Sequence, residues 1–278
     1  MNVFDAATVW ILAKRELRSA VFGIGVYLAI LTSLIISSII LQNILMAVSR
    51  DRMLIIASPF SYPLFVAAGA CTIYLAISAA TSIARERDSQ TLELLFYGPV
   101  NHSSYIFSKY LKGVLTYLFI ILFLSIYFIL SSLISNLGLS FRLLGVLILS
   151  FFLSSCVISF GILISTLTEN VRTSILFFLG IVGGLIAIQI TLEILANMGE
   201  TSLHPAIRYL INTLGLIHAV VKWISPFYYL NEGLDAVSSG SAGRFFLSGI
   251  TSIIYTAVML LSSVFALKGK GVRKTTGE

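Results

Sequence analysis

Charged side chains are scarce in this chain and are missing altogether from six long stretches of it. Asp, Glu, Lys and Arg make up 11% of the 278 residues, whereas soluble domains carry about 25%. A helix needs about 20 apolar residues to cross the roughly 30 Å hydrocarbon core of a bilayer. The sequence therefore excludes an ordinary soluble domain and predicts six transmembrane helices, over residues 19–49, 53–84, 113–141, 143–168, 173–192 and 245–267.

Residue patterns typical of catalytic, metal-binding or nucleotide-binding sites are equally scarce. The two cysteines, Cys71 and Cys156, fall inside predicted spans and indicate neither a disulfide framework nor a metal site. The sequence lacks the G-x-x-x-x-G-K-[ST] motif that a nucleotide-binding P-loop requires. No charged residue or His lies in the middle of a span, which argues against an ion-coupled carrier, and no His cluster or carboxylate pair favours an intramembrane enzyme. We expect a chain that is not an enzyme and holds no metal or cofactor.

The 18 Lys and Arg residues outnumber the 12 acidic residues, and their placement explains the excess. When the six spans are threaded through a membrane, the segments 1–18, 85–112, 169–172 and 268–278 share one side and hold 12 of the basic residues. The other side holds 6. Because Lys and Arg concentrate in cytoplasmic loops, we expect both termini in the cytoplasm. The net charge of +6 then reflects topology and does not favour nucleic acid as a partner.

The N-terminal segment has the composition of a helix at a membrane surface. Residues 1–18 combine Trp10 with a cluster of basic residues at 14–18. Aromatic and basic residues together suit the boundary between headgroups and acyl chains. We predict a short interfacial helix; the alternative is that these residues only lengthen the first span.

The connection between the second and third spans carries the most informative pattern. Residues 85–88 alternate in charge, and Asp88 and Ser89 can cap a new helix by accepting its free N–H groups. An apolar run over 92–97 follows, and Gly98-Pro99 ends it. The pattern predicts a short amphipathic helix on the cytoplasmic side, suited to a groove on a soluble partner. The alternative is an ordinary interfacial loop.

Two predicted spans carry a stripe of small or weakly polar residues along one helical face. In the second span the stripe consists of Cys71, Tyr74, Ser78 and Ser82. In the fifth span it consists of Gly180, Gly184, Ala187 and Thr191. Spacings of three and four residues align each set, and a GxxxG motif permits close approach of two helices. Both faces are expected to point away from lipid and either pack against other helices or line a substrate path.

The longest connection, residues 193–244, lies on the predicted outer side. Within it, residues 203–223 have apolar residues at helical spacing interrupted by charged residues and His, so another full span is not expected. We predict one or two short helices in the outer leaflet. Ser225-Pro226-Phe227 then breaks the chain before the sixth span.

Residues 85–112 resemble the corresponding loop of ABC-2 permeases, the transmembrane subunits of one group of ATP-binding-cassette transporters. That loop typically reads E-R-E-x-G-T-L-E-x-L-L-x-x-P, followed by a Lys near the next span. Gln90 stands where the family usually has Gly. The resemblance extends over the chain, through the basic N-terminal segment, the six spans, the Ser-Pro-Phe and the basic tail. The matching residues of the loop are Glu86, Arg87, Thr91, Leu92, Glu93, Leu95, Pro99 and Lys109.

The resemblance implies an all-α integral membrane protein with one ABC-2 type transmembrane domain over residues 1–278. In that family the segment matching 1–18 is an interfacial elbow helix, 85–112 contains the coupling helix and 193–244 forms an outer gate region. The implied ATPase-coupling residues are Glu86, Arg87, Thr91, Leu92, Glu93, Leu95, Phe96 and Pro99. The implied path-lining residues are Tyr74, Ser78, Ser82, Gly180, Gly184 and Ala187. The implied outer gate consists of Ser225, Pro226 and Phe227.

The function that the resemblance implies is that of a permease subunit in an ABC exporter. It would pair with a second permease subunit, as a homodimer or heterodimer, and with two copies of a separate ATPase subunit that holds ATP and Mg. The complex would lie in the cytoplasmic (inner) membrane of a prokaryote, among membrane lipids, and work by alternating access. The apolar stripes favour an amphipathic or lipid-like cargo. The alternative is an ion-coupled secondary transporter or channel subunit.

Overall fold

The computed structural model describes residues 6–51, 60–97, 100–135, 142–197, 236–237 and 241–270. Within these residues all regular elements are helices: α1 (Ala6–Val21), α2 (Ile24–Asp51), α3 (Ser61–Asp88), α4 (Thr91–Phe96), α5 (His102–Ser135), α6 (Arg142–Leu167), α7 (Val171–Asn197) and α10 (Ala242–Lys270). Six of them are long and apolar enough to cross a membrane, namely α2, α3, α5, α6, α7 and α10. The prediction of an all-α integral membrane protein with six spans is confirmed.

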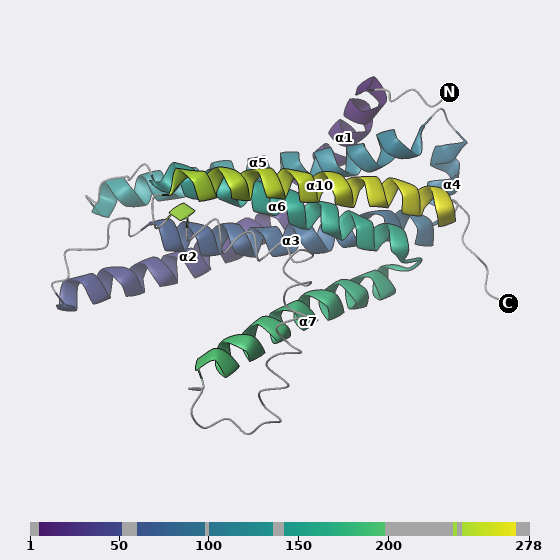
Figure 1. The fold of residues 1–278 in the computed structure, drawn as a ribbon. Coiled ribbons are helices and arrows are strands. Elements are labelled where there is room, and N and C mark those ends of the chain that lie inside the picture. The colour runs from purple at the N-terminus through teal and green to yellow at the C-terminus, as the bar shows by residue number, and fades with distance from the viewer. Residues whose placement is uncertain are drawn as a thin grey trace, which may run out of the picture.

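Helix α6 lies at the centre of the bundle, where it packs against α3 and α10 (Figure 1). A glycine allows α3 to come close. A Cβ atom on Gly161 would lie 2.8 Å from the carbonyl oxygen of Ala76 and 3.0 Å from the Cβ atom of Ala79. Such contacts would force a backbone to move, so the missing side chain at Gly161 sets the separation of α3 and α6.

The outward faces of several long helices carry large apolar side chains that are more than half exposed. These faces suit contact with lipid chains, since the spans are as long as the hydrocarbon core requires. Examples on α2, α5, α7 and α10 are Leu28, Leu31, Leu122, Leu133, Phe177, Leu179, Ile253 and Leu261.

Helix α1 is separate from the first span. The chain turns at Phe22 and Gly23, and α2 begins at Ile24. Helix α1 packs mainly against α5, and its buried residues are Val9 and Ala13. The alternative that residues 6–18 only lengthen the first span is therefore wrong, and that span begins at Ile24 rather than at residue 19.

One end of the bundle gathers the short helices. Figure 1 shows α4 beside the C-terminal end of α10, with α1 projecting near the same end. Leu267 near the end of α10 belongs to the same buried apolar cluster as Leu92 of α4 and Tyr105 of α5. The predicted outer-leaflet helices and the gate residues Ser225, Pro226 and Phe227 lie outside the described residues.

Candidate functional site

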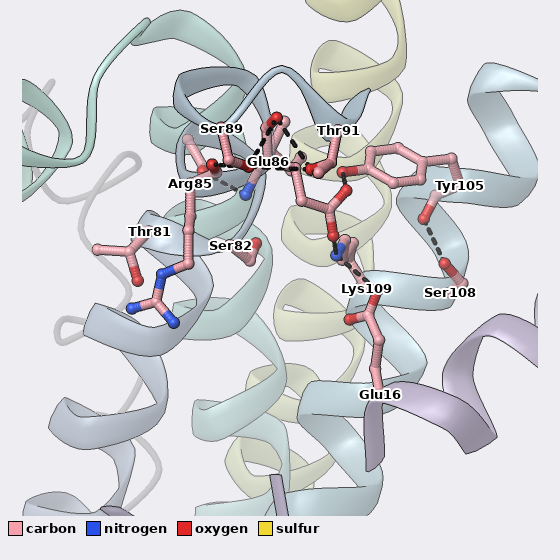
Figure 2. A network of polar contacts seen from close by, with 12 residues as sticks. Glu16, Thr81, Ser82, Arg85, Glu86, Ser89, Thr91, Tyr105, Ser108 and Lys109 are labelled. Atoms are coloured by element: carbon pink, nitrogen blue, oxygen red, sulfur yellow. Dashed lines mark hydrogen bonds and ion pairs between the residues drawn. The ribbon is translucent and has the colours of Figure 1, made fainter. Parts of the chain in front are cut away.

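One buried cation joins three helices at this end of the bundle. The Lys109 ammonium on α5 lies 2.5 Å from Oε1 of Glu16 on α1 and also contacts Oε1 of Glu86 at the end of α3 (Figure 2). Tyr105, one turn earlier on α5, donates its hydroxyl to Oε2 of Glu86 at 2.6 Å. Lys109 is 4% exposed. Because a buried charge without a partner is costly, this network fixes α1 and the end of α3 onto α5.

A second cation attaches the end of α3 to the end of α6. Arg87 is buried, and its Nη1 atom donates hydrogen bonds to the carbonyl oxygens of Thr166 and Thr168, at 3.3 and 2.8 Å. Thr166 lies in the last turn of α6 and Thr168 just after its end. Carbonyl groups at the end of a helix lack intrahelical partners, and a basic side chain stabilises them. Arg87 therefore attaches the end of α3 to the end of α6.

Two serines reach the backbone of α3 one turn before these charges. The Oγ atom of Ser165 on α6 accepts hydrogen bonds from the backbone N–H groups of Ile83 and Ala84, at 2.9 and 3.0 Å. The hydroxyl of Ser174 on α7 donates to the carbonyl oxygen of Ala80. With the two cations, these bonds connect the last turns of α3 to α1, α5, α6 and α7.

Helix α4 presents one face to the bundle and the other to its surroundings. Leu92 is fully buried, and Leu95 and Phe96 are partly buried against the main core. The ring of Phe96 stacks on His102 with the ring centroids 4.6 Å apart. Leu94 is 70% exposed on the opposite face, and Tyr97 is 85% exposed just after the helix. The surface that α4 offers to a partner therefore differs from the face that holds it in place.

Gln90 connects α3 to α4 in a left-handed conformation, with φ 60° and ψ 10°. Among the described residues other than glycine it is alone in having a positive φ. Ser89 does not cap α4 as predicted, because its hydroxyl donates to the carbonyl oxygen of Arg85 and so closes α3. The residue at the N-cap position of α4 is Gln90, whose side chain makes no capping bond. The left-handed position after a helix favours glycine, which accounts for the Gly in the ABC-2 pattern.

A cavity of about 500 Å³ opens between α1, α3 and α5. Its charged end contains Glu16, Arg85, Glu86, Lys109 and Lys112, and its wall along α3 contains Tyr74, Ile77, Ser78, Thr81 and Ser82. The stripe of the second span thus divides into two parts. Tyr74, Ser78 and Ser82 line the cavity, whereas Cys71 is buried and its Sγ atom lies 2.9 Å from the Oγ atom of Ser33 on α2.

The stripe of the fifth span has no neighbour within the described part of the chain. Gly180, Gly184 and Ala187 are exposed on α7. A Cβ atom on either glycine would meet nothing within 4 Å. The predicted close approach at this GxxxG motif is therefore absent among the described helices, and the face is open to lipid or to another chain.

The six candidate spans fit the ABC-2 pattern. Comparison with protein families gives a direct result: the profile described as "ABC-2 family transporter protein" matches residues 10–270. The chain belongs to the ABC-2 transporter family. It is the permease subunit of an ABC transporter, a multi-pass membrane protein that pairs with an ABC ATPase subunit. Comparisons with curated proteins and with solved structures found no match.

The structure brings most of the predicted coupling residues of the permease together at the α3–α4 junction. Arg87 and Leu92 are buried, Glu86 is partly exposed and bound to Lys109, and the hydroxyl of Thr91 donates to the carbonyl oxygen of Glu86 at 3.2 Å. Glu93 is partly exposed. Pro99 lies outside the described residues.

Sequence reasoning missed two parts of this site. It did not pair Lys109 with Glu16 and Glu86, because helix orientation decides which distant charges meet. It also missed Leu94 and Tyr97 as the exposed apolar residues. The buried and exposed faces of α4 could have been predicted from the spacing of its apolar residues. Residues 92, 95 and 96 share one helical face, and residue 94 does not lie on it.

Substitutions at Gln90 test the strain at the junction of the permease. Gln90→Gly is expected to keep or raise the apparent melting temperature of the purified protein, because glycine adopts φ 60° freely. Gln90→Val is expected to lower stability by about 1 kcal/mol or more, since a β-branched residue is strained there. Thermal unfolding followed by intrinsic fluorescence measures both. Equal stability of the two variants would contradict the left-handed geometry.

Proposed function

We propose that the permease is one half of an ABC exporter, in which two permease subunits surround a path and two copies of a separate ATPase subunit bind ATP and Mg. The observation that carries this proposal is the attachment of the α3 end to α1, α5, α6 and α7 beside a short surface helix. A movement of α4 would be passed through the end of α3 to the four helices attached there, α1, α5, α6 and α7. Such a junction suits transmission of ATP-driven movement to the membrane.

The contact with the ATPase is assigned to the exposed face of α4. Leu94 and Tyr97 supply apolar area, and Glu93, partly exposed beside them, supplies a charge that fixes orientation. Leu92, Leu95 and Phe96 act from the other side, where they hold α4 on the bundle. The predicted coupling set thus divides into residues that touch the partner and residues that pass its movement on.

Transport proceeds by alternating access. Movement of α4 displaces the end of α3, and with it the wall of the cavity formed by Tyr74, Ser78 and Ser82. Rigid-body rotation of the two permease halves then moves the path from inward to outward access. Gly180, Gly184 and Ala187 of α7 are assigned to the interface or path shared with the second permease, as homodimer or heterodimer. Residues 225–227 form the outer gate.

A pair of exposed residues tests the coupling role. Leu94→Ala combined with Tyr97→Ala is expected to weaken binding of the ATPase subunit by about 2 kcal/mol, or roughly thirtyfold, since truncated anchors at an interface cost about that much. Co-purification of the ATPase with the permease and its rate of ATP hydrolysis in vesicles measure the effect.

The matched control is Trp10→Ala with Ile11→Ala, because this aromatic and aliphatic pair is also exposed, on α1. The control variant should bind the ATPase as the wild type does. If the α4 variant also binds and hydrolyses ATP normally, α4 is only a connector and the coupling role must be abandoned.

The proposed orientation places both termini and α4 in the cytoplasm of a prokaryotic cell. Single cysteines in place of Ser89 and Ala242, in a background without Cys71 and Cys156, should therefore react with a membrane-impermeant maleimide from opposite sides of the inner membrane. Ser89 follows α3 and Ala242 begins α10, and both are exposed. Reaction of both positions from the outside would overturn the topology.

A further inference from the structure

The cavity between α1, α3 and α5 has an excess of positive charge that the protein itself does not neutralise. Three cations line it, Arg85, Lys109 and Lys112, against two carboxylates, Glu16 and Glu86. Both carboxylates are bound to Lys109. Arg85 and Lys112 form no ion pair or side-chain hydrogen bond with any described residue. The cavity therefore carries one positive charge in excess, and two of its three cations, Arg85 and Lys112, are not engaged in an ion pair with a described residue.

Arg85 and Lys112 line the same cavity. Arg85 and Lys112 come from different helices, α3 and α5. Lys112 is attracted by Glu16 and Glu86 and repelled by Lys109 and Arg85. In Figure 2 the Arg85 side chain runs back along α3 to the level of Thr81, apart from the cluster around Lys109. Lys112 is partly buried. An anion between them would relieve their repulsion and accept charge-assisted hydrogen bonds from both.

The rest of the cavity is not charged. From Glu86 its wall follows α3 back to Tyr74, a distance of about 18 Å at 1.5 Å per residue. Over this length α3 contributes Ile77 and the weakly polar Ser78 and Ser82, and Ala20 and Gly23 line the opposite side. A free inorganic anion would use only the charged end. An amphipathic molecule would fill both parts.

We propose that this cavity binds an amphipathic anion, with its phosphate or carboxylate headgroup between Arg85 and Lys112 and its apolar chain along α3 toward Tyr74. Basic sites between helices at the cytoplasmic end of a membrane protein bind anionic headgroups in this way. The inference builds on the proposed function, because it names the ligand class of the cavity that the path residues of α3 line. The ligand is either cargo on its way out or an anionic lipid taken from the bilayer.

Binding to the purified full-length permease, without ATPase or ATP, tests the proposal. Fluorescent phosphatidylglycerol is the anionic probe, and phosphatidylcholine of the same chain length is the zwitterionic comparison. The wild type should bind phosphatidylglycerol more tightly. Arg85→Gln with Lys112→Gln should weaken that binding at least tenfold, about 1.4 kcal/mol, and leave phosphatidylcholine unaffected.

Two control variants separate the site from general charge and folding effects. Arg15→Gln with Arg172→Gln removes the same charge from exposed positions outside the cavity and should bind within twofold of wild type. Arg85→Lys with Lys112→Arg keeps both cations and should also retain binding. No preference of the wild type for the anionic probe, or unchanged binding by the double Gln variant, would overturn the proposal.

Reconstitution with the ATPase distinguishes the two sources of ligand. Release of the bound probe during ATP hydrolysis identifies it as cargo, and retention identifies a resident bilayer lipid; either result requires the site. Because the binding assay needs no ATPase, failure of α4 coupling would leave this inference standing. Failure of binding with intact coupling would remove the inference and leave the exporter proposal.

Discussion

Replacing Lys109 with Ala is expected to destabilise the permease by about 3 kcal/mol. The substitution leaves Glu16 and Glu86 close together without their cation, and removing one partner of a buried ion pair costs about 3–5 kcal/mol. The lower end applies because the side chains of Glu16 and Glu86 are 16% and 25% exposed. Thermal unfolding of the purified protein measures the loss. Labelling of a cysteine placed at the buried Ala13 of α1 should accelerate, because α1 loses its attachment to α5.

Two companion variants show whether charge pairing is the cause. Lys109→Arg keeps the cation and should retain most of the stability. The triple change Lys109→Met, Glu16→Gln and Glu86→Gln removes all three charges and should be more stable than Lys109→Met alone, because neither carboxylate is then left without its cation. If Lys109→Ala unfolds at the wild-type temperature, or the triple variant gains nothing, the network does not hold these helices together.

The second large effect is expected at Gly161. Gly161→Leu places a Cβ atom 2.8 Å from a backbone oxygen of α3, so α3 and α6 must separate, and overpacking of this kind costs about 1–3 kcal/mol or more. The separation would also strain the bonds from Ile83 and Ala84 to Ser165 on the next turn of α6. The yield of monodisperse protein in size-exclusion chromatography should fall sharply.

Gly184→Leu is the matched comparison, since a Cβ atom at that position meets none of the described residues within 4 Å. The Gly184 variant should therefore insert and purify as the wild type does. In the assembled transporter it should nevertheless reduce transport, because the open face of α7 is assigned to the second permease or the path. Normal transport by Gly184→Leu would remove α7 from that assignment, and normal folding of Gly161→Leu would contradict the close contact of α3 with α6.

The transmembrane spans could be predicted because they depend only on the length and composition of a continuous stretch of the sequence. Each stretch without charge is long enough to cross the bilayer, and a helix follows in each case. The start of the third long helix could also be predicted, since a cap at Asn101 or Ser103 leads past Lys109 and Lys112 into the span, and α5 begins at His102. The partners of Lys109 could not be predicted, because they come from α1 and α3 and no local pattern reveals them.

The two glycine sites illustrate the same limit. The GxxxG motif at Gly180 and Gly184 suggested close helix contact, yet the tightest backbone approach on α6 occurs at the isolated Gly161. A GxxxG motif makes close packing of two helices possible. Whether the packing forms depends on which face of the helix meets a neighbouring helix. In α4, by contrast, the buried face could be predicted from the sequence. Leu92, Leu95 and Phe96 are spaced so that all three lie on one side of this short helix.

The fastening of the α3 end has a consequence for recombination between related permeases. The groups that meet there come from distant parts of the chain, with Glu16 near its start, Lys109 beyond the surface helix, and Ser165 and Ser174 on either side of the turn after α6. A chimaera joined between α1 and α2, or between α6 and α7, inherits some of these groups from each parent. Exchange of whole segments is therefore restricted, even where the apolar spans are interchangeable, because these polar partners are all present only when this end of the bundle comes from one parent.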